Sequence, residues 1–357
     1  MAEKKKSRKG LIALIIILVI MAAGVITVFS VLDFDKEDPV NNEEYTVDDD
    51  KNYLKELGGF TDIKDLLKSW SDMTEEKDLM QSDDVINFLI IGSDLSEYNS
   101  DVIMIMSLNK DTKKVYLTSV MRDCYTYIPT STESRFLKIN ASYGIGGAEK
   151  LIETVQKDFK IKIDHYLSVN FDTFRKVVDA IGGIQLNVPQ YVAEAIGRGC
   201  PYGNNVTLNG ELALHFVRIR STDDDADISR TRRQREFINA VIDRSREVKL
   251  SQLAEVFKII LTYVKTDCST ADLIKYATQG IIGRWYKYSI VSNAYPVEED
   301  RYDYQGDSWV WIVDYPAAAR RLQSMIYGKT NIVLGNDRVT AIDLIKQKNE
   351  ESTTAEP

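Results

Sequence analysis

Two aspartates stand on either side of a short turn and could bind one metal ion together. Asp94 follows the apolar segment 86–92, and Asp101 precedes the apolar segment 102–109. Carboxylates at the ends of neighbouring strands can converge on a hard cation, and Mg²⁺ takes oxygen ligands while keeping several of its waters. The structural interpretation of the same pair is a turn residue and a strand cap. Spacing alone leaves both interpretations open.

Arginine is concentrated in residues 216–237, FVRIRSTDDDADISRTRRQREF, which contain six arginines and no lysine. The guanidinium is a planar fork that matches phosphate oxygens, whereas the lysine ammonium is a point charge. If the segment is helical, its three- and four-residue spacing places four residues on one face, namely Arg230, Arg233, Gln234 and Phe237. That face fits a pyrophosphate beside apolar surface. The alternative is a solvated charge run, in which the aspartates of the segment neutralise the arginines.

A further arginine and aspartate, Arg122 and Asp123, directly follow the apolar segment 113–120. A single Arg-Asp pair is most often a structural or surface ion pair, and such pairs contribute little by themselves. Arg122 therefore gains a role in phosphate binding only if the fold brings other arginines to it.

The segments around these residues predict an α/β fold, with a mixed central sheet flanked by helices. Residues 86–92 and 102–109 are apolar runs bounded by turn residues, which is typical of buried strands. Residues 113–120 follow the turn NKDT and predict an antiparallel hairpin with 102–109. The pattern also predicts helices at 148–159 and 171–180 and strands at 164–171 and 184–188. Beyond Asn209 we expect mostly helix, apart from residues 288–296.

The composition indicates a folded protein and excludes several classes. The chain has 357 residues, of which 44% are hydrophobic and 28% are charged, so it can bury a core. Its net charge of −9 argues against nucleic acid as a partner, because tracking phosphates along a nucleic acid requires a basic surface. The three cysteines and two histidines show no CxxC or paired Cys/His spacing, which argues against a zinc site. A disulfide framework is not expected either, although a single bridge between Cys200 and Cys268 stays open.

The N-terminal region predicts a membrane anchor. Residues 11–32 contain no charge and would form a helix of about 33 Å, which is long enough to cross a bilayer. A cleaved signal peptide is the alternative, but its apolar core is normally about 7–15 residues long. Basic residues precede the segment and acidic residues follow it, so we expect a cytoplasmic N-terminus and an extracellular remainder.

The chain is expected to have five parts. They are a basic cytoplasmic N-terminus at residues 1–10, a transmembrane helix at 11–32, an acidic stalk at 33–83, one folded domain at 84–345 and a disordered tail at 346–357. One helix, between Asp62 and Trp70, is expected within the stalk.

Seven short motifs, in this order, resemble the LytR-CpsA-Psr family of membrane-anchored bacterial cell-wall enzymes. Between about Asn87 and Asn239 they read NFLIIGSD, SDVIMIMSLN, SVMRD, KINASYGIGG, VVDAIGGIQLNV, LNGELALHFVRIR and DISRTRRQ. Each motif is weakly specific alone. Seven of them in sequence, behind one apolar N-terminal segment, make the resemblance specific.

The resemblance implies an α-β-α domain that transfers a glycopolymer from an undecaprenyl pyrophosphate carrier to peptidoglycan, with Mg²⁺ as cofactor. Teichoic acids, capsular polysaccharides and other wall polysaccharides are the glycopolymers of the family. The implied partners are this lipid-linked glycan, peptidoglycan and the cell membrane, with the C-terminal domain outside the bacterial cell.

Individual positions of the chain match functional positions of the family. The implied metal ligands are Asp94 and Asp101. The residues implied to bind the pyrophosphate are Arg122, Arg218, Arg220, Arg230, Arg233 and Gln234. The implied catalytic residues are Asp101, Arg122 and Asp227, and either Asp101 or Asp227 could accept the hydroxyl proton. Asp123 also matches a position typical of the family.

The chain departs from the family pattern at Asn99. The family usually has Arg-Ser-Asp where this chain has Asn99-Ser100-Asp101, so one positive charge is missing beside the expected site. Two other functions stay open at this stage. One is a lipid-linked pyrophosphate hydrolase that releases the glycan to water, and the other is a non-catalytic regulator or scaffold of the cell envelope.

Overall fold

The computed structural model describes most of the region from residue 61 to residue 354. The described residues are 61–93, 100–130, 135–219, 264–305, 309–335 and 338–354, with 232, 233, 235–237, 239, 240 and 244. The expected transmembrane helix, residues 11–32, lies outside them. Among the described residues, no helix combines the length and the apolar character that a membrane crossing requires.

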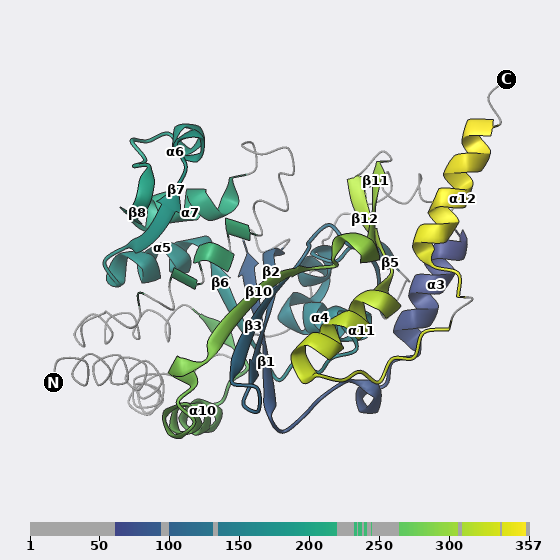
Figure 1. Cartoon of the computed structure of the whole chain (residues 1–357), viewed down its shortest axis with the longest axis horizontal. Coiled ribbons are helices and arrows are strands. Elements are labelled where there is room, and N and C mark those ends of the chain that lie inside the picture. The colour runs from purple at the N-terminus through teal and green to yellow at the C-terminus, as the bar shows by residue number, and fades with distance from the viewer. Residues whose placement is uncertain are drawn as a thin grey trace.

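A mixed six-stranded sheet forms the centre of the fold (Figure 1). Its strands are β1 (Val85–Ser93), β2 (Ser100–Asn109), β3 (Lys114–Val120), β6 (His165–Asn170), β9 (Lys265–Thr266) and β10 (Ser289–Tyr295). The order across the sheet is β10-β3-β2-β1-β6-β9. β2 is antiparallel to both β1 and β3, which confirms the predicted hairpin, whereas β6 is parallel to β1 and β10 is parallel to β3.

Helices cover both faces of the sheet. On one face, α4 (Ala141–Phe159) and α11 (Tyr315–Tyr327) share the main hydrophobic core with β1 and β2. On the other face, α10 (Thr270–Ile282) brings Tyr276 to the ring of Phe88 on β1. The observed α4 begins seven residues before the predicted helix, because it continues through a kink at the two glycines 146 and 147. Gly147 has φ +63°, which a residue with a side chain rarely adopts.

A second hydrophobic cluster forms the lobe that follows β6. The lobe consists of α5 (Phe171–Ala180), β7 (Ile184–Val188), α6 (Gln190–Ile196), β8 (Gly203–Leu208) and α7 (Gly210–Arg218). Asn170 and Asn209 cap α5 and α7 by accepting hydrogen bonds from Thr173 and Leu212. The two helices approach so closely at Gly210 that a Cβ atom there would lie 2.4 Å from the carbonyl oxygen of Arg175.

Two hairpins were not predicted from the sequence. They pair β4 (Tyr125–Ile128) with β5 (Arg135–Lys138) and β11 (Arg301–Gln305) with β12 (Trp309–Val313). The expectation of mostly helix after Asn209 is therefore wrong for β11 and β12. The apolar run of β12 does not alternate, so its pattern alone does not distinguish a strand from a buried helix segment. The remaining short elements are the 3₁₀ turns η2 (Glu76–Asp78), η3 (Trp285–Lys287) and η4 (Glu298–Asp300).

The folded part extends beyond the expected limits at both ends. Helix α3 (Thr61–Asp72) buries Ile63 and Leu67 in the main core, so residues 61–83 are not a stalk separate from the domain. Helix α12 (Ala341–Thr354) buries Ile345 in the same core and includes most of the expected tail, which is helical as far as Thr354. The two helices contact each other and share this core, a pairing that local composition does not reveal.

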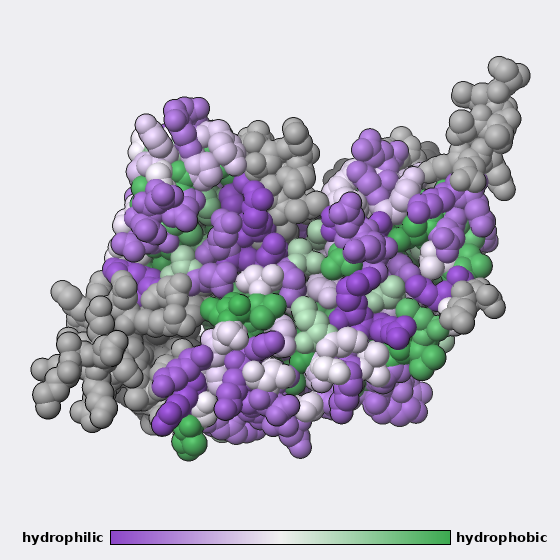
Figure 2. Space-filling model, viewed as in Figure 1, coloured by the Kyte–Doolittle hydropathy of each residue, from purple (hydrophilic) through white to green (hydrophobic). Residues whose placement is uncertain are grey.

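The surface seen in Figure 2 is mainly hydrophilic. Apolar side chains on this face gather in small separate groups and do not form one continuous patch. Scattered exposed apolar residues are normal for a folded domain.

Candidate functional site

The ends of three strands meet at one edge of the central sheet. Ser93 at the end of β1 pairs with Ser100 at the start of β2, and Ile103 of β2 pairs with Val120 at the end of β3. The backbone of Asp101 lies at an irregularity in the pairing of β1 with β2, because Gly92 pairs with Val102 and Ser93 pairs with Ser100. Arg122 follows β3 at the same edge. The fold therefore positions the two residues at the ends of adjacent strands.

The main chain of Asn140 connects these two strand ends. Its N–H donates a hydrogen bond of 3.3 Å to the carbonyl oxygen of Arg122, and its own carbonyl oxygen accepts one of 3.5 Å from the N–H of Ser100. Asn140 is buried and directly precedes α4. The beginning of the KINASYGIGG motif thus has a structural role, because it fixes Arg122 relative to the start of β2.

Arg122 is part of a partly buried charge cluster. Its Nε lies 3.3 Å from Oδ2 of Asp123, and Nζ of Lys138 lies 2.6 Å from Oδ1 of the same carboxylate. The exposed fractions of the Arg122 and Asp123 side chains are 17% and 6%. Counted over these three described side chains, one carboxylate lies between two cations, which gives a charge of +1. It therefore favours an anion at this edge of the sheet.

Two arginines of the arginine-rich segment that were predicted to bind pyrophosphate are among the described residues. Arg218 is exposed at the end of α7, and Arg233 is buried and donates a hydrogen bond from Nη2 to the carbonyl oxygen of Ile219. Phe237 is buried with Arg233, and its ring centroid lies 4.6 Å from that of Phe174. Arg232 is exposed, as expected from its position on the other face of the helix.

Several predicted site residues lie outside the described part. They are Asp94, Arg220, Asp227, Arg230 and Gln234, together with Asn99 and the side chain of Asp101. Among the described residues, Arg122 lies at the edge of the sheet where β2 begins. Arg233 contacts Ile219, which directly follows Arg218.

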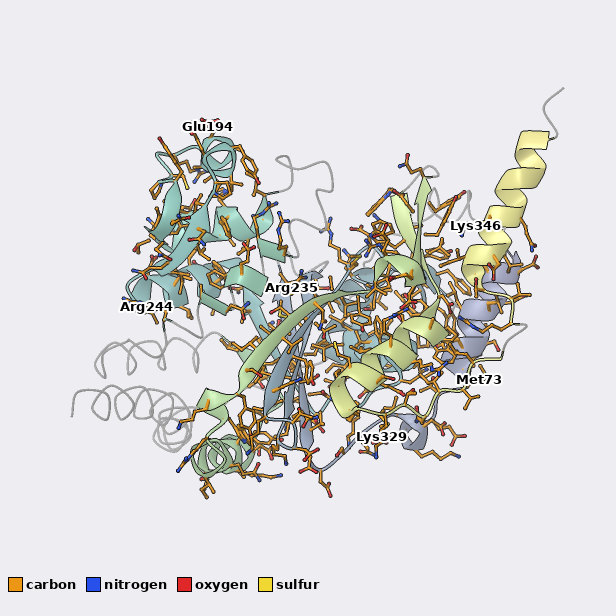
Figure 3. All side chains as sticks on the ribbon, in the orientation of Figure 1. Met73, Glu194, Arg235, Arg244, Lys329 and Lys346 are labelled. Carbon is orange, nitrogen blue, oxygen red and sulfur yellow. The ribbon has the colours of Figure 1, made fainter. Side chains whose placement is uncertain are left out.

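A pocket of about 700 Å³ lies in the lobe, beside the helical residues that include Arg232 and Arg233. Its polar lining residues include Asn187, Arg232, Arg233, Asn239 and Arg244. Figure 3 shows Arg235 on the side of the lobe that faces the central sheet and Arg244 below α5. Burial lowers the pKa of Arg235.

Sequence reasoning missed Arg244. Its Nε and Nη2 donate hydrogen bonds of 3.3 and 3.2 Å to the carbonyl oxygen of Ile181, at the end of α5. The signal that could have found it is the spacing from Arg233, because eleven residues correspond to about three helical turns and return to the same face.

Comparison with known proteins identifies the family. The model of the LytR_cpsA_psr family matches residues 59–325, so the chain belongs to the LytR-CpsA-Psr family. The match begins near α3, in agreement with the packing of that helix into the core.

Two curated relatives carry the name polyisoprenyl-teichoic acid--peptidoglycan teichoic acid transferase TagU. The protein from Bacillus licheniformis is 30% identical over 201 residues, which are 54% of this chain and 63% of the relative. The protein from Bacillus subtilis is 31% identical over 191 residues, which are 52% of this chain and 60% of the relative. The matched regions thus span less than two thirds of these relatives.

Solved structures share the fold. The structure described as TagT bound to LI-WTA has a TM-score of 0.58 at 23% identity, and the match covers 71% of this chain and 94% of that one. A LytR-CPS2A-psr family protein, YwtF (TagT), with bound octaprenyl pyrophosphate lipid has a TM-score of 0.54 at 22% identity, with 72% and 95% coverage.

Proposed function

We propose that this protein transfers a polyisoprenyl pyrophosphate-linked glycopolymer to peptidoglycan. The observation that carries the proposal is the pair of main-chain hydrogen bonds of Asn140, which connects Arg122 to the start of β2, where Asp101 lies. Family membership and the transferase names of the relatives support it. The octaprenyl pyrophosphate lipid bound by a protein of the same fold supports this class of donor substrate.

The arginines are proposed to bind the pyrophosphate. Asp123 contacts Nε of Arg122 and so orients the plane of the guanidinium, which is what recognition of phosphate oxygens requires. Arg218 and Arg233 are proposed as further ligands, and Arg220, Arg230 and Gln234 of the same segment are proposed to join them. Phosphoryl transfer depends mainly on positioning and charge stabilisation, and a set of permanently charged guanidiniums provides both.

Asp94 and Asp101 are proposed to hold Mg²⁺. The donor set fits, because the two carboxylates belong to adjacent strand ends and provide the oxygen ligands that Mg²⁺ prefers. Ser93 and Ser100, which directly precede Asp94 and Asp101 in the chain, pair with each other in the sheet. When bound, Mg²⁺ supplies positive charge that neutralises the pyrophosphate oxygens.

The reaction requires a bond change at one phosphorus atom. A sugar hydroxyl of peptidoglycan attacks the phosphorus attached to the glycan, the bond from this phosphorus to the bridging oxygen breaks, and polyprenyl phosphate leaves. The hydroxyl proton passes to a carboxylate, for which Asp101 and Asp227 are the two candidates. Arg122 binds the phosphate oxygens throughout and stabilises the charge that develops on them.

The proposed location of this reaction is the outer face of the bacterial cell membrane. Residues 11–32 are uncharged and long enough to span the bilayer, and the basic residues before them favour a cytoplasmic N-terminus. A membrane anchor of this orientation brings the folded domain to a lipid-linked donor.

An assay with and without acceptor tests the proposal. The full-length protein in detergent is incubated with Mg²⁺ and a lipid-linked glycan labelled in its sugar, and label is measured in sedimented peptidoglycan and in solution. We expect label in the sediment that resists washing with denaturant. Soluble glycan, released equally with and without peptidoglycan, would instead identify a hydrolase.

A further inference from the structure

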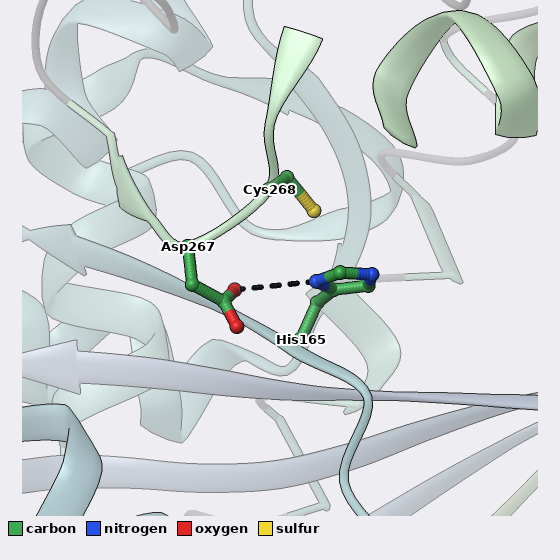
Figure 4. A group of neighbouring side chains, drawn as sticks. All are labelled: His165, Asp267 and Cys268. Carbon is green, nitrogen blue, oxygen red and sulfur yellow. Dashed lines mark ion pairs between the residues drawn. The ribbon is translucent and has the colours of Figure 1, made fainter. Parts of the chain in front are cut away.

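The strand pairing of β6 with β9 brings a histidine, an aspartate and a cysteine together at the edge of the sheet. Leu167 pairs with Thr266 and Ser168 pairs with Lys265 in antiparallel register. Extending this register by two residues places Asp267 opposite Tyr166 and Cys268 opposite His165. The three side chains converge from two segments that are far apart in the chain (Figure 4).

The potential ligand atoms of this group are close together. One atom each from His165, Asp267 and Cys268 lies within 4.8 Å of the other two. Nδ1 of His165 is buried, has no hydrogen-bond partner among the described residues and lies 3.5 Å from Oδ1 of Asp267. In a tetrahedral zinc site with bonds of about 2.0–2.3 Å, ligand atoms lie about 3.5 Å apart. Small side-chain rotations therefore suffice to complete three zinc bonds.

Neighbouring groups fix the side chains of His165 and Asp267 and the main chain of Cys268. Nε2 of His165 forms a hydrogen bond of 2.8 Å with the hydroxyl of Tyr276. Metal-bound histidines usually donate their second ring nitrogen in this way, which leaves Nδ1 for the metal. The N–H of Tyr166 donates a hydrogen bond of 2.9 Å to Oδ1 of Asp267, and the N–H of Cys268 donates one of 3.1 Å to Oγ1 of Thr266.

Cys268 is a free cysteine, so its sulfur is not part of a disulfide.

We propose that His165, Asp267 and Cys268 form a zinc site, with water as the fourth ligand. The combination of a thiolate, an imidazole and one carboxylate suits Zn²⁺, whereas Mg²⁺ prefers oxygen ligands alone. The sequence argued against zinc because it contains no short-range Cys/His spacing. That argument does not apply to this group, because strand pairing brings its members together from distant parts of the chain.

This zinc site is distinct from the site proposed for pyrophosphate transfer. β1 and β6 are parallel, with Phe88 paired to His165 and Ser93 paired to Asn170. Five residues along a strand correspond to about 16 Å, so His165 lies that far from the end of β1 where Asp94 follows. The zinc is proposed to fasten the two-residue strand β9 to β6 and so to stabilise this edge of the sheet.

Metal binding by the full-length protein in detergent tests the proposal. The protein is stripped with a chelator, dialysed against Zn²⁺ and analysed for bound zinc, and a parallel sample receives Co²⁺ for absorption spectroscopy. We expect one Zn²⁺ per chain, a thiolate-to-cobalt charge-transfer band, and a higher melting temperature with zinc than without. Wild-type protein that binds no stoichiometric zinc overturns the proposal.

Matched variants assign the ligands. We expect zinc binding to weaken at least tenfold in each of the variants Cys268→Ser, His165→Gln and Asp267→Asn. Cys268→Ser is also expected to remove the charge-transfer band. Cys200→Ser and His215→Gln alter a comparable cysteine and histidine outside the group, so they are expected to bind as wild type. Circular dichroism of the zinc-free variants checks folding, and the exposed Asp267 provides the variant least able to disturb it. Zinc binding that survives all three ligand substitutions contradicts the proposal.

Discussion

The Oδ2 atom of Asp123 lies 3.3 Å from the Nε atom of Arg122. The carboxylate is buried and also pairs with Lys138, so it holds the guanidinium at the edge of the sheet where β2 begins. Asp123 thus acts through Arg122 and Lys138 as a positioning residue, and its contribution to stability can be separated from its contribution to activity.

Replacing Asp123 with asparagine is expected to destabilise the protein. The change leaves two largely buried cations without their shared carboxylate, and the loss of charged hydrogen bonds of this kind costs about 2–3 kcal/mol each. Urea unfolding measures the difference in free energy. Asp65→Asn, an exposed change on α3, is the control and should stay within about 0.5 kcal/mol of wild type. Equal stability of the two variants would contradict the structural role of Asp123.

The close approach of α5 and α7 predicts a strong effect of Gly210→Ala. A Cβ atom at position 210 would lie 2.4 Å from the backbone oxygen of Arg175, and the backbone cannot rotate away as a side chain can. We expect a loss of about 1–3 kcal/mol in thermal or urea unfolding. At Gly335 a Cβ atom meets nothing within 4 Å, so Gly335→Ala should be nearly neutral. A stable Gly210→Ala variant would show that the two helices are further apart than the structure has them.

The stability of the fold is expected to depend on the titration of Asp158. This side chain is buried, both of its oxygens lie within 2.9 Å of Oγ1 of Thr126, and burial raises its pKa to about 8. A pKa that is higher in the folded than in the unfolded protein contributes stability at low pH, and this contribution is lost as the pH rises from about 4 to about 8. Lys160 faces Asp158, but burial lowers its pKa only to about 8, so it stays protonated over most of this range.

Melting temperatures between pH 4 and pH 8 check this expectation. Asp158→Asn keeps a group that can accept the hydroxyl hydrogen bond and removes the titration, so its melting temperature should vary less with pH than that of the wild type. The exposed Asp62→Asn variant is expected to follow the wild-type curve. Parallel curves for wild type and Asp158→Asn would refute the assignment.

Removal of Mg²⁺ is expected to abolish transfer to peptidoglycan. If Asp94 and Asp101 hold the ion, a chelator stops the reaction and added Mg²⁺ restores it in the wild type. Asp101→Asn is expected to lower the rate about a hundredfold and to need more Mg²⁺ for half-maximal activity. Asp111→Asn changes an exposed aspartate in the turn after β2 and should behave as wild type. A wild-type enzyme that remains fully active in chelator would exclude this role of the two aspartates.

The centre of the fold was predictable because its strands carry their own signals. The apolar runs of β1, β2 and β3 fill buried positions on both faces of the sheet, and the turn between β2 and β3 is polar. The pairing of α3 with α12 was not predictable, because the two helices come from opposite ends of the described chain and join the same core only in the tertiary structure. The hairpin β11–β12 was missed because the apolar run of β12 does not alternate, so its pattern alone does not distinguish a strand from a buried helix segment.

The candidate site was predictable in part for a similar reason. The helical spacing correctly predicted that Arg233 and Phe237 lie on one face, which is buried in the structure. No local pattern could reveal the contact of Arg233 with the carbonyl of Ile219 or the bridge that Asn140 makes to Arg122, because both depend on tertiary structure. The grouping of His165 with Cys268 likewise follows only from the register of β6 with β9.

Transfer of labelled glycan to peptidoglycan by Arg122 variants tests the central claim most directly. Arg122→Ala removes the charge from the sheet edge and is expected to lower the initial rate about a hundredfold or more, and Arg122→Lys is expected to restore only part of it, since it lacks the planar fork. Arg320→Ala, an exposed change on α11, is the matched control and should keep the wild-type rate. Transfer by a folded Arg122→Ala variant at the rate of wild type and of Arg320→Ala would contradict the claim that Arg122 binds the reacting pyrophosphate.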